Sequence, residues 1–161
     1  MTDVVVGRVL APGTASGTVL ALAAPLSLWG GVDPATGVIV DPRHPDVGRS
    51  LAGRIVVLPA VRGSSSSSSV LAELLRAGVG PLAIVLGQSD EILAIGAVVA
   101  AQLYGAVCPV VLVEGPDYAH LAGASTISIG VDGHVRTTRG RRSPRPRISD
   151  SSTGPRGREQ S

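Results

Sequence analysis

The fold is decided by the stretch IVVLPAVRGSSSSSSVLAELLRAG, residues 55–78, in which a run of six serines joins two patterned segments. The apolar run Ile55–Leu58 before the serines is typical of a buried strand. After the serines, leucines recur at helical spacing, and Gly78 supplies a stop signal. The serines are therefore predicted to form a strand-to-helix turn, with at least one of them at the N-terminus of a helix over Ser68–Ala77.

The serine run admits a second interpretation, because runs of serine are often low-complexity linkers. This run is only six residues long and lies between two patterned segments, where short connections are normal, so its flanks favour an ordered turn. At a helix N-terminus, unpaired backbone N–H groups and the positive end of the helix dipole converge. Such a turn is suited to hold an anionic group or to ease the ionisation of a hydroxyl.

Outward from this turn, short apolar runs alternate with helical patterns. That alternation is typical of β-α-β units with a parallel sheet. We therefore expect an α/β fold with a mainly parallel sheet, flanking helices and a small N-terminal β layer. The expected strands are Val4–Leu10, Gly17–Ala21, Val38–Asp41, Arg54–Leu58, Leu82–Leu86, Pro109–Val113, Thr126–Val131 and His134–Thr137, and the second expected helix is Asp90–Tyr104.

Charge divides the chain into two parts. Residues 1–138 contain seven arginines and ten acidic residues, whereas residues 139–161 contain seven arginines and two acidic residues. The second part has almost no apolar residues, so we expect a folded domain over 1–138 and a disordered, Arg-rich tail over 139–161. The tail could be an arm for nucleic acid. No aromatic residues alternate with its arginines to stack on bases, so we expect no nucleic-acid partner.

The chain offers few residues for metal or covalent chemistry. Its single cysteine, Cys108, lies in an apolar stretch and is expected to be a buried, inert thiol in a reducing cytosol. The histidines at 44, 120 and 134 show no metal-binding spacing, so we expect no metal on this chain. The apolar segment Ile92–Tyr104 is too short to span a bilayer, and no signal peptide opens the chain. We therefore expect a cytoplasmic protein that does not bind membranes.

Three loops could meet beyond the carboxyl ends of parallel strands, where α/β folds bind ligands. They are Arg62–Ser66, Gly87–Asp90 and Trp29–Asp33. The glycine pair in the last loop would let its backbone approach a ligand or another chain, but a plain turn with an exposed Trp is an equal alternative. The serine run matches neither a nucleophile elbow nor, without lysine, a Walker A loop. A serine could still act as an acid or base beside a helix N-terminus and an arginine.

Several stretches together resemble the small swivelling domain of aconitase X. They are PLSLWGGVDPATG at residues 25–37, Asp41-x-x-His44-Pro45, Gly48-Arg49-Ser50-x-Ala52-Gly53-Arg54, Arg62-Gly63-Ser64-Ser65 and Pro81-x-Ala83-Ile84. The similarity covers roughly residues 3–137. It implies a compact swivelling β/β/α domain in a hydro-lyase that dehydrates a small hydroxy acid, with cis-3-hydroxy-L-proline as the first choice. It also implies that the domain works with a large catalytic subunit, which holds an iron or iron–sulfur centre.

The same resemblance implies roles for individual residues. In aconitase-like enzymes a serine after a glycine removes the proton next to a carboxylate, and the matching position here is Ser64. Aconitase has an arginine two positions further on, where this chain has Ser66, and the preceding arginine could replace its charge. The remaining serines at 66, 67 and 69 are expected to take less part in the chemistry. Expected substrate-binding residues are Arg62, Gly63, Ser65, Gly30, Gly31, Asp33 and His44, although a surface-loop role for the histidine is favoured.

Two alternatives stay open. The chain could be the small subunit of a phosphomevalonate dehydratase, the other activity of the family. It could also be a non-catalytic binding module, because its N-terminal glycine pattern and residues 104–111 resemble the phosphohistidine swivel domain of phosphoenolpyruvate-using enzymes. The phosphorylated histidine of that domain would follow the glycine turn at the start of the helix, where this chain has only serines.

Overall fold

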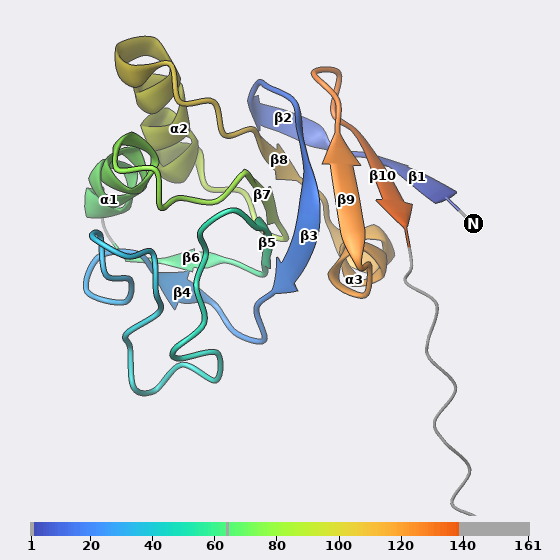
Figure 1. Ribbon diagram of the computed structural model, residues 1–161. Coiled ribbons are helices and arrows are strands. Elements are labelled where there is room, and N and C mark those ends of the chain that lie inside the picture. Colours follow the sequence, from blue (N-terminus) through green and yellow to red (C-terminus); the bar gives the residue numbers. More distant parts are fainter. Residues whose placement is uncertain (1, 64, 139–161) are drawn as a thin grey trace, which may run out of the picture.

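The computed structural model describes residues 2–63 and 65–138, which form one eight-stranded sheet, a separate two-stranded pair and three helices (Figure 1). The strands are β1 (Thr2–Val6), β2 (Arg8–Ala11), β3 (Ala15–Ala21), β4 (Leu26–Ser27), β5 (Ile55–Leu58), β6 (Val61–Arg62), β7 (Ala83–Leu86), β8 (Val110–Leu112), β9 (Thr126–Ile129) and β10 (His134–Thr138). The helices are α1 (Ser66–Arg76), α2 (Glu91–Tyr104) and α3 (Gly115–Ala122). The expected tail and Ser64 lie outside the described residues.

The eight-stranded sheet is mixed, with the order β1-β10-β9-β3-β5-β7-β8-β2. Its centre, from β3 through β5 and β7 to β8, is parallel, whereas the strands on either side are antiparallel. The strand β3 belongs to both parts, because residues 15–18 pair with β9 and residues 19–21 pair with β5. Only Gly7 separates β1 from β2, although these strands stand at opposite ends of the order. The sheet therefore curls round on itself.

The α/β class is confirmed, and the smaller β layer has a composition that the sequence did not reveal. It combines β1 and the first half of β3 with the C-terminal strands β9 and β10. The expected strand Val38–Asp41 is wrong: this segment forms only isolated bridges, from Val38 to Ser50 and from Ile39 to Val32. The strands β4 and β6 were not expected, since two residues are too short to show a pattern of alternation.

The core lies on both faces of the central strands, as expected of parallel strands made of continuous apolar runs. On one face, Val56 and Leu58 of β5 pack in a cluster with Leu71 and Leu74 of α1 and with residues of α2. On the other face, Ile55 and Val57 belong to a second cluster that includes Leu121 of α3 and residues of β9 and β10. Figure 1 shows α1 and α2 together on one side of the sheet and α3 on the other.

Local signals explain where α2 begins and ends. The carboxylate of Asp90 accepts a hydrogen bond from the backbone N–H of Leu93 (2.8 Å) and caps the first turn. Gly105 ends the helix in the left-handed conformation at φ 64°. The following loop leads to Cys108, which is buried as expected, and burial raises the pKa of its thiol to about 12. None of the described helices is both long and apolar enough to cross a membrane.

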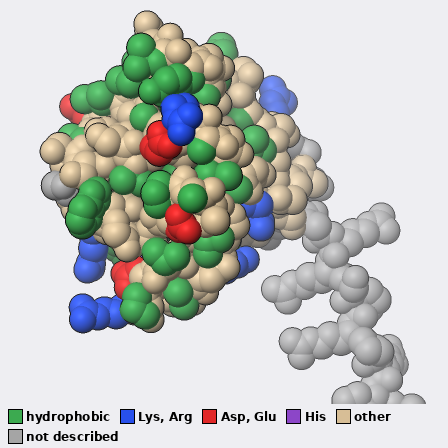
Figure 2. Space-filling view, turned by 60° about the vertical axis from the view of Figure 1, so that its left-hand side comes forward, with side chains coloured by type: hydrophobic (Ala, Val, Ile, Leu, Met, Phe, Trp, Pro, Cys, Tyr) green, Lys and Arg blue, Asp and Glu red, His purple; other side chains and the backbone are tan. Residues whose placement is uncertain are grey.

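The outer side of α2 is apolar, although it faces solvent. Figure 2 turns the helix side of the molecule forward and shows hydrophobic side chains over much of this face. Apart from Glu91, the helix carries no charged residue. An exposed apolar helix face of this kind is typical of a surface that another protein covers. Its exposed large side chains are Ile92, Ile95, Val98, Val99, Leu103 and Tyr104.

The two helices α1 and α2 cross at Gly96. A methyl group on its α-carbon would overlap the backbone of Ser68 in α1. We predict that Gly96→Ala lowers the free energy of unfolding by about 1–3 kcal/mol through overpacking, although alanine alone favours a helix over glycine by about 1 kcal/mol. Urea unfolding of the variant measures this change, with Ser69→Ala at an exposed position of α1 as the control. A Gly96→Ala protein as stable as the wild type would contradict the close crossing.

Candidate functional site

The short parallel pair of β4 and β6 brings two of the expected loops together. Leu26 pairs with Val61, and Ser27 pairs with Arg62, so both strands end at the same edge. The loop that starts at Leu28 and the turn that starts at Gly63 therefore leave this edge side by side, as the lower left of Figure 1 shows. Ligands of α/β folds gather at such carboxyl ends, so this edge is the candidate site.

Glycines allow the two loops to approach each other. Gly63 has φ 111°, a conformation that residues with a side chain rarely adopt. A methyl group on its α-carbon would lie only 3.0 Å from Ser27 Oγ. The Ser27 hydroxyl in turn donates a hydrogen bond to the carbonyl oxygen of Trp29 (3.0 Å). The α-carbon of Gly31 lies so close to the Ser27 carbonyl that no side chain would fit there.

The serine turn leads directly into α1, as predicted, but the helix begins at Ser66, two residues earlier than expected. Ser65 occupies the N-cap position, and its side chain makes no capping hydrogen bond. Its carbonyl oxygen accepts a hydrogen bond from the Ser68 hydroxyl (2.8 Å). The first turn contains no acidic residue. The positive end of the helix therefore has no carboxylate within its own first turn to neutralise it.

The other expected residues at this edge differ in what they offer a ligand. Arg62 is exposed, and its guanidinium makes no ion pair with any other residue that the structure describes. Trp29 is 66% exposed, and Gly30 beside it has φ 77° and open space around its α-carbon. Asp33 has a local role, because its Oδ1 accepts a hydrogen bond from the backbone N–H of Ala35 (2.9 Å).

The structure places His44 in the interior instead of on the surface-loop position that was favoured. The ring is buried, and its Nδ1 accepts a hydrogen bond from the backbone N–H of Asp46 (3.0 Å). Its Nε2 therefore carries the proton and donates to the carbonyl oxygen of Ala24 (3.1 Å). Both ring nitrogens are thus used by backbone groups. His44 holds the segment before β4 in place and has no nitrogen left for a substrate in this conformation.

The third expected loop, Gly87–Asp90, makes its contacts elsewhere. The Ser89 hydroxyl accepts a hydrogen bond from the guanidinium of Arg8 (3.0 Å), on β2. Gly87 lies against the ring of Tyr118, where burial raises the pKa of the phenol to about 12. The contacts of this loop with β2 and α3 therefore tie it to those elements and not to the serine turn.

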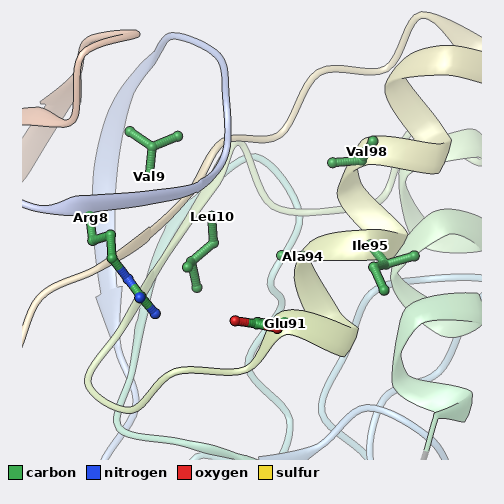
Figure 3. A pocket seen from close by; sticks show the side chains of 7 residues that line it. All are labelled: Arg8, Val9, Leu10, Glu91, Ala94, Ile95 and Val98. Atoms are coloured by element: carbon green, nitrogen blue, oxygen red, sulfur yellow. The ribbon is translucent and has the colours of Figure 1, made fainter.

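A surface hollow of about 460 Å³ also lies away from the serine turn (Figure 3). It opens between β2 and α2, and in the close-up the side chains of Arg8 and Glu91 point into the same space. Its walls are mainly apolar, and none of the residues that line it belongs to the loops after β4 or β6. We place the candidate site at the serine turn, because helix N-terminus, arginine and close glycines converge there.

Two serines of the site were missed or undervalued in the sequence. Ser27 carried no signal, because β4 is too short to be recognised. Ser67 was grouped with the less important serines, yet it is buried, whereas Ser69 is exposed. The spacing of Ser67 from Leu71 and Leu74 is the helical spacing of a buried face and could have shown this. The described residues contain no group of three or more His, Cys, Asp or Glu side chains that could hold a metal ion.

Comparison with known proteins identifies the family. The family model of the aconitase X swivel domain matches residues 4–137, which include the serine turn and the loop after β4. The chain therefore belongs to the aconitase X swivel domain family. This match decides between the aconitase X resemblance and the phosphohistidine-type alternative at the level of family.

Relatives of known name include two kinds of dehydratase. Cis-3-hydroxy-L-proline dehydratase of Pseudomonas aeruginosa is 48% identical over 106 residues, which are 66% of this chain but 18% of that protein. The phosphomevalonate dehydratase small subunit of Pyrococcus furiosus is 36% identical over 127 residues, 79% of this chain and 87% of that subunit. The crystal structure of Thermococcus kodakaraensis aconitase X in its holo-form superposes with a TM-score of 0.73 at 31% identity, covering 85% of this chain and 99% of that chain.

The buried contacts of His44 lead to a prediction about stability. His44→Ala should lower the free energy of unfolding by about 2–4 kcal/mol, because it leaves a cavity and two backbone groups without partners. The matched control is His134→Ala, since His134 is exposed in a turn and a surface change there should stay within about 0.5 kcal/mol. Urea unfolding of both variants measures the difference. Equal stability of the two variants would show that the His44 ring does not hold the loop.

Proposed function

We propose that this chain is the swivel subunit of an aconitase X-type dehydratase that acts on a small hydroxy acid, with cis-3-hydroxy-L-proline as the first choice. One observation carries the proposal: the serine turn lies beside the Trp29-Gly30-Gly31 loop at the carboxyl ends of β4 and β6, within the family match. The relative with 48% identity supports the choice of substrate. Phosphomevalonate is the alternative, supported by the relative that the chain covers at 87% of its length.

In this proposal Ser64 is the base. Its alkoxide would take the proton from the carbon next to the substrate carboxylate and become a neutral hydroxyl again. Its sequence neighbours favour the ionised form, because Arg62 precedes it by two residues and the N-terminus of α1 follows it by two. Arg62, Gly63, Ser65, Gly30 and Gly31 are proposed to surround the substrate.

The metal belongs to the partner in this proposal. No group of described residues on this chain suits a metal ion, so the chain itself is proposed to bind none. An iron or iron–sulfur centre in the large subunit would supply a Lewis acid for the leaving hydroxyl. The division of labour then places the base on this chain and the Lewis acid on its partner, and neither is active alone.

The apolar face of α2 supports a large protein partner. In the Pseudomonas relative the matched region is 18% of a longer chain, and the Pyrococcus relative is named a small subunit. We propose that a large aconitase X-type subunit covers the exposed side chains of α2 and meets the serine turn with the same surface, because α1 packs directly on α2 at Gly96. We also propose a cytoplasmic location, which suits the free, buried thiol of Cys108.

The assembled enzyme gives the direct test of the substrate. The chain is co-purified with an aconitase X-type large subunit from the same organism and assayed on cis-3-hydroxy-L-proline and on phosphomevalonate. We expect dehydration of hydroxyproline, and none by either subunit alone, because base and metal lie on different chains. Turnover of phosphomevalonate without turnover of hydroxyproline would replace the first choice by the alternative.

A single substitution tests the base. Ser64→Ala should lower turnover by about 10²–10⁴-fold, which is the usual contribution of a positioned general base. The variant should still fold and bind its partner, because a hydroxyl in a turn adds little to the core. Ser69→Ala, at an exposed position of α1, is the matched control and should keep wild-type turnover. Steady-state rates of both variants in the assembled enzyme decide the matter, and near-wild-type turnover of Ser64→Ala would remove Ser64 from the mechanism.

A further inference from the structure

Ser67 is a polar residue on the buried face of α1. The helix places Ser67, Leu71 and Leu74 on one stripe, and all three are buried, with Ser67 only 2% exposed. The two leucines belong to the apolar core cluster on this side of the sheet. A serine at the end of such a stripe places a hydroxyl where the pattern calls for an apolar side chain.

The hydroxyl of Ser67 has no partner among the residues that the structure describes. Its neighbours behave differently: the Ser68 hydroxyl donates to the carbonyl oxygen of Ser65, and the Ser27 hydroxyl donates to that of Trp29. A buried polar group without a hydrogen bond lowers stability and is rare in native proteins, so it calls for an explanation. A ligand that completes the hydrogen bond is such an explanation.

The position of the hydroxyl shows where that ligand would lie. A methyl group on the α-carbon of Gly63 would lie 3.9 Å from Ser67 Oγ and 3.0 Å from Ser27 Oγ. The missing side chain of Gly63 therefore leaves a small space that both hydroxyls border. Gly63 itself is exposed, so this space is open to solvent on one side.

The charge around this space favours an anion. Arg62 is the neighbour of Gly63, and the first turn of α1 presents the positive end of a helix without an acidic residue. A hydroxyl donates a stronger hydrogen bond to an ionised oxygen than to a neutral one. The chemistry of the site thus matches a carboxylate oxygen.

We propose that Ser67 is a substrate-binding residue, whose hydroxyl donates a hydrogen bond to a carboxylate oxygen of the hydroxy acid in the space above Gly63. The inference rests on the proposed function, because it takes the hydroxy acid as the ligand. Ser27 forms the opposite wall of the space and keeps the Trp29 turn in place through its own hydrogen bond. The bond of Ser67 is made to bound substrate and persists in the transition state, so it contributes to binding and little to the chemical step.

The test compares Ser67→Ala with Ser69→Ala, which removes an exposed hydroxyl from the same helix. In the lone chain, Ser67→Ala should unfold at or above the wild-type temperature, because alanine removes an unpaired buried hydroxyl and favours the helix. In the assembled enzyme, its KM for cis-3-hydroxy-L-proline should rise by about tenfold or more, with kcat little changed. Ser67→Cys keeps the size of the side chain and weakens the donor, so its KM should lie between these values.

The outcomes separate the inference from the proposed function. An active enzyme whose KM is unchanged by Ser67→Ala would overturn the role of Ser67 and leave the proposed function intact. A clear loss of stability in the lone Ser67→Ala chain would also overturn it, because the hydroxyl would then be a structural group. A wild-type pair that turns over neither hydroxyproline nor phosphomevalonate would refute the proposed function, and the inference with it.

Discussion

The structure depends on the double pairing of β3. Its first four residues form an antiparallel ladder with β9, and its last three form a parallel ladder with β5. One strand thereby joins the two parts of the sheet, and each part gives the other a surface to cover. Because the alternate side chains of β5 enter different apolar clusters, the helices α1 and α2 on one side and α3 on the other depend on this junction.

The candidate site depends on a much smaller contact, the pair of β4 and β6. Each strand has two residues, and a pair this short is too small to be stable alone. Its support comes from outside. His44 donates to the carbonyl oxygen of Ala24, and the carboxylate of Asp46 accepts from the backbone N–H of Ala23, so the segment before β4 is held at two points. Residues far from the serine turn therefore determine where the turn and the Trp29 loop meet.

The helices and central strands could be predicted because their signals are local. The apolar runs of β5, β7 and β8, the capping Asp90 and the terminal Gly105 act within a few residues of the structure that they determine. The fate of Val38–Asp41 could not be predicted in this way. Its apolar pattern is that of a strand, but no neighbouring strand lies within reach to form a ladder, so it remains a loop with two isolated bridges.

The sequence by itself determined the strand, the serine turn and the helix that follows, together with the motifs that mark the aconitase X swivel domain family. Only the tertiary structure decided that Ser27 borders the space beside Gly63, that His44 is buried, and that Ser67 differs from Ser69. The physical reason is the range of the contacts. Capping and periodicity act along the chain, whereas Ser27 and Gly63 are 36 positions apart and meet through backbone pairing that no local pattern encodes.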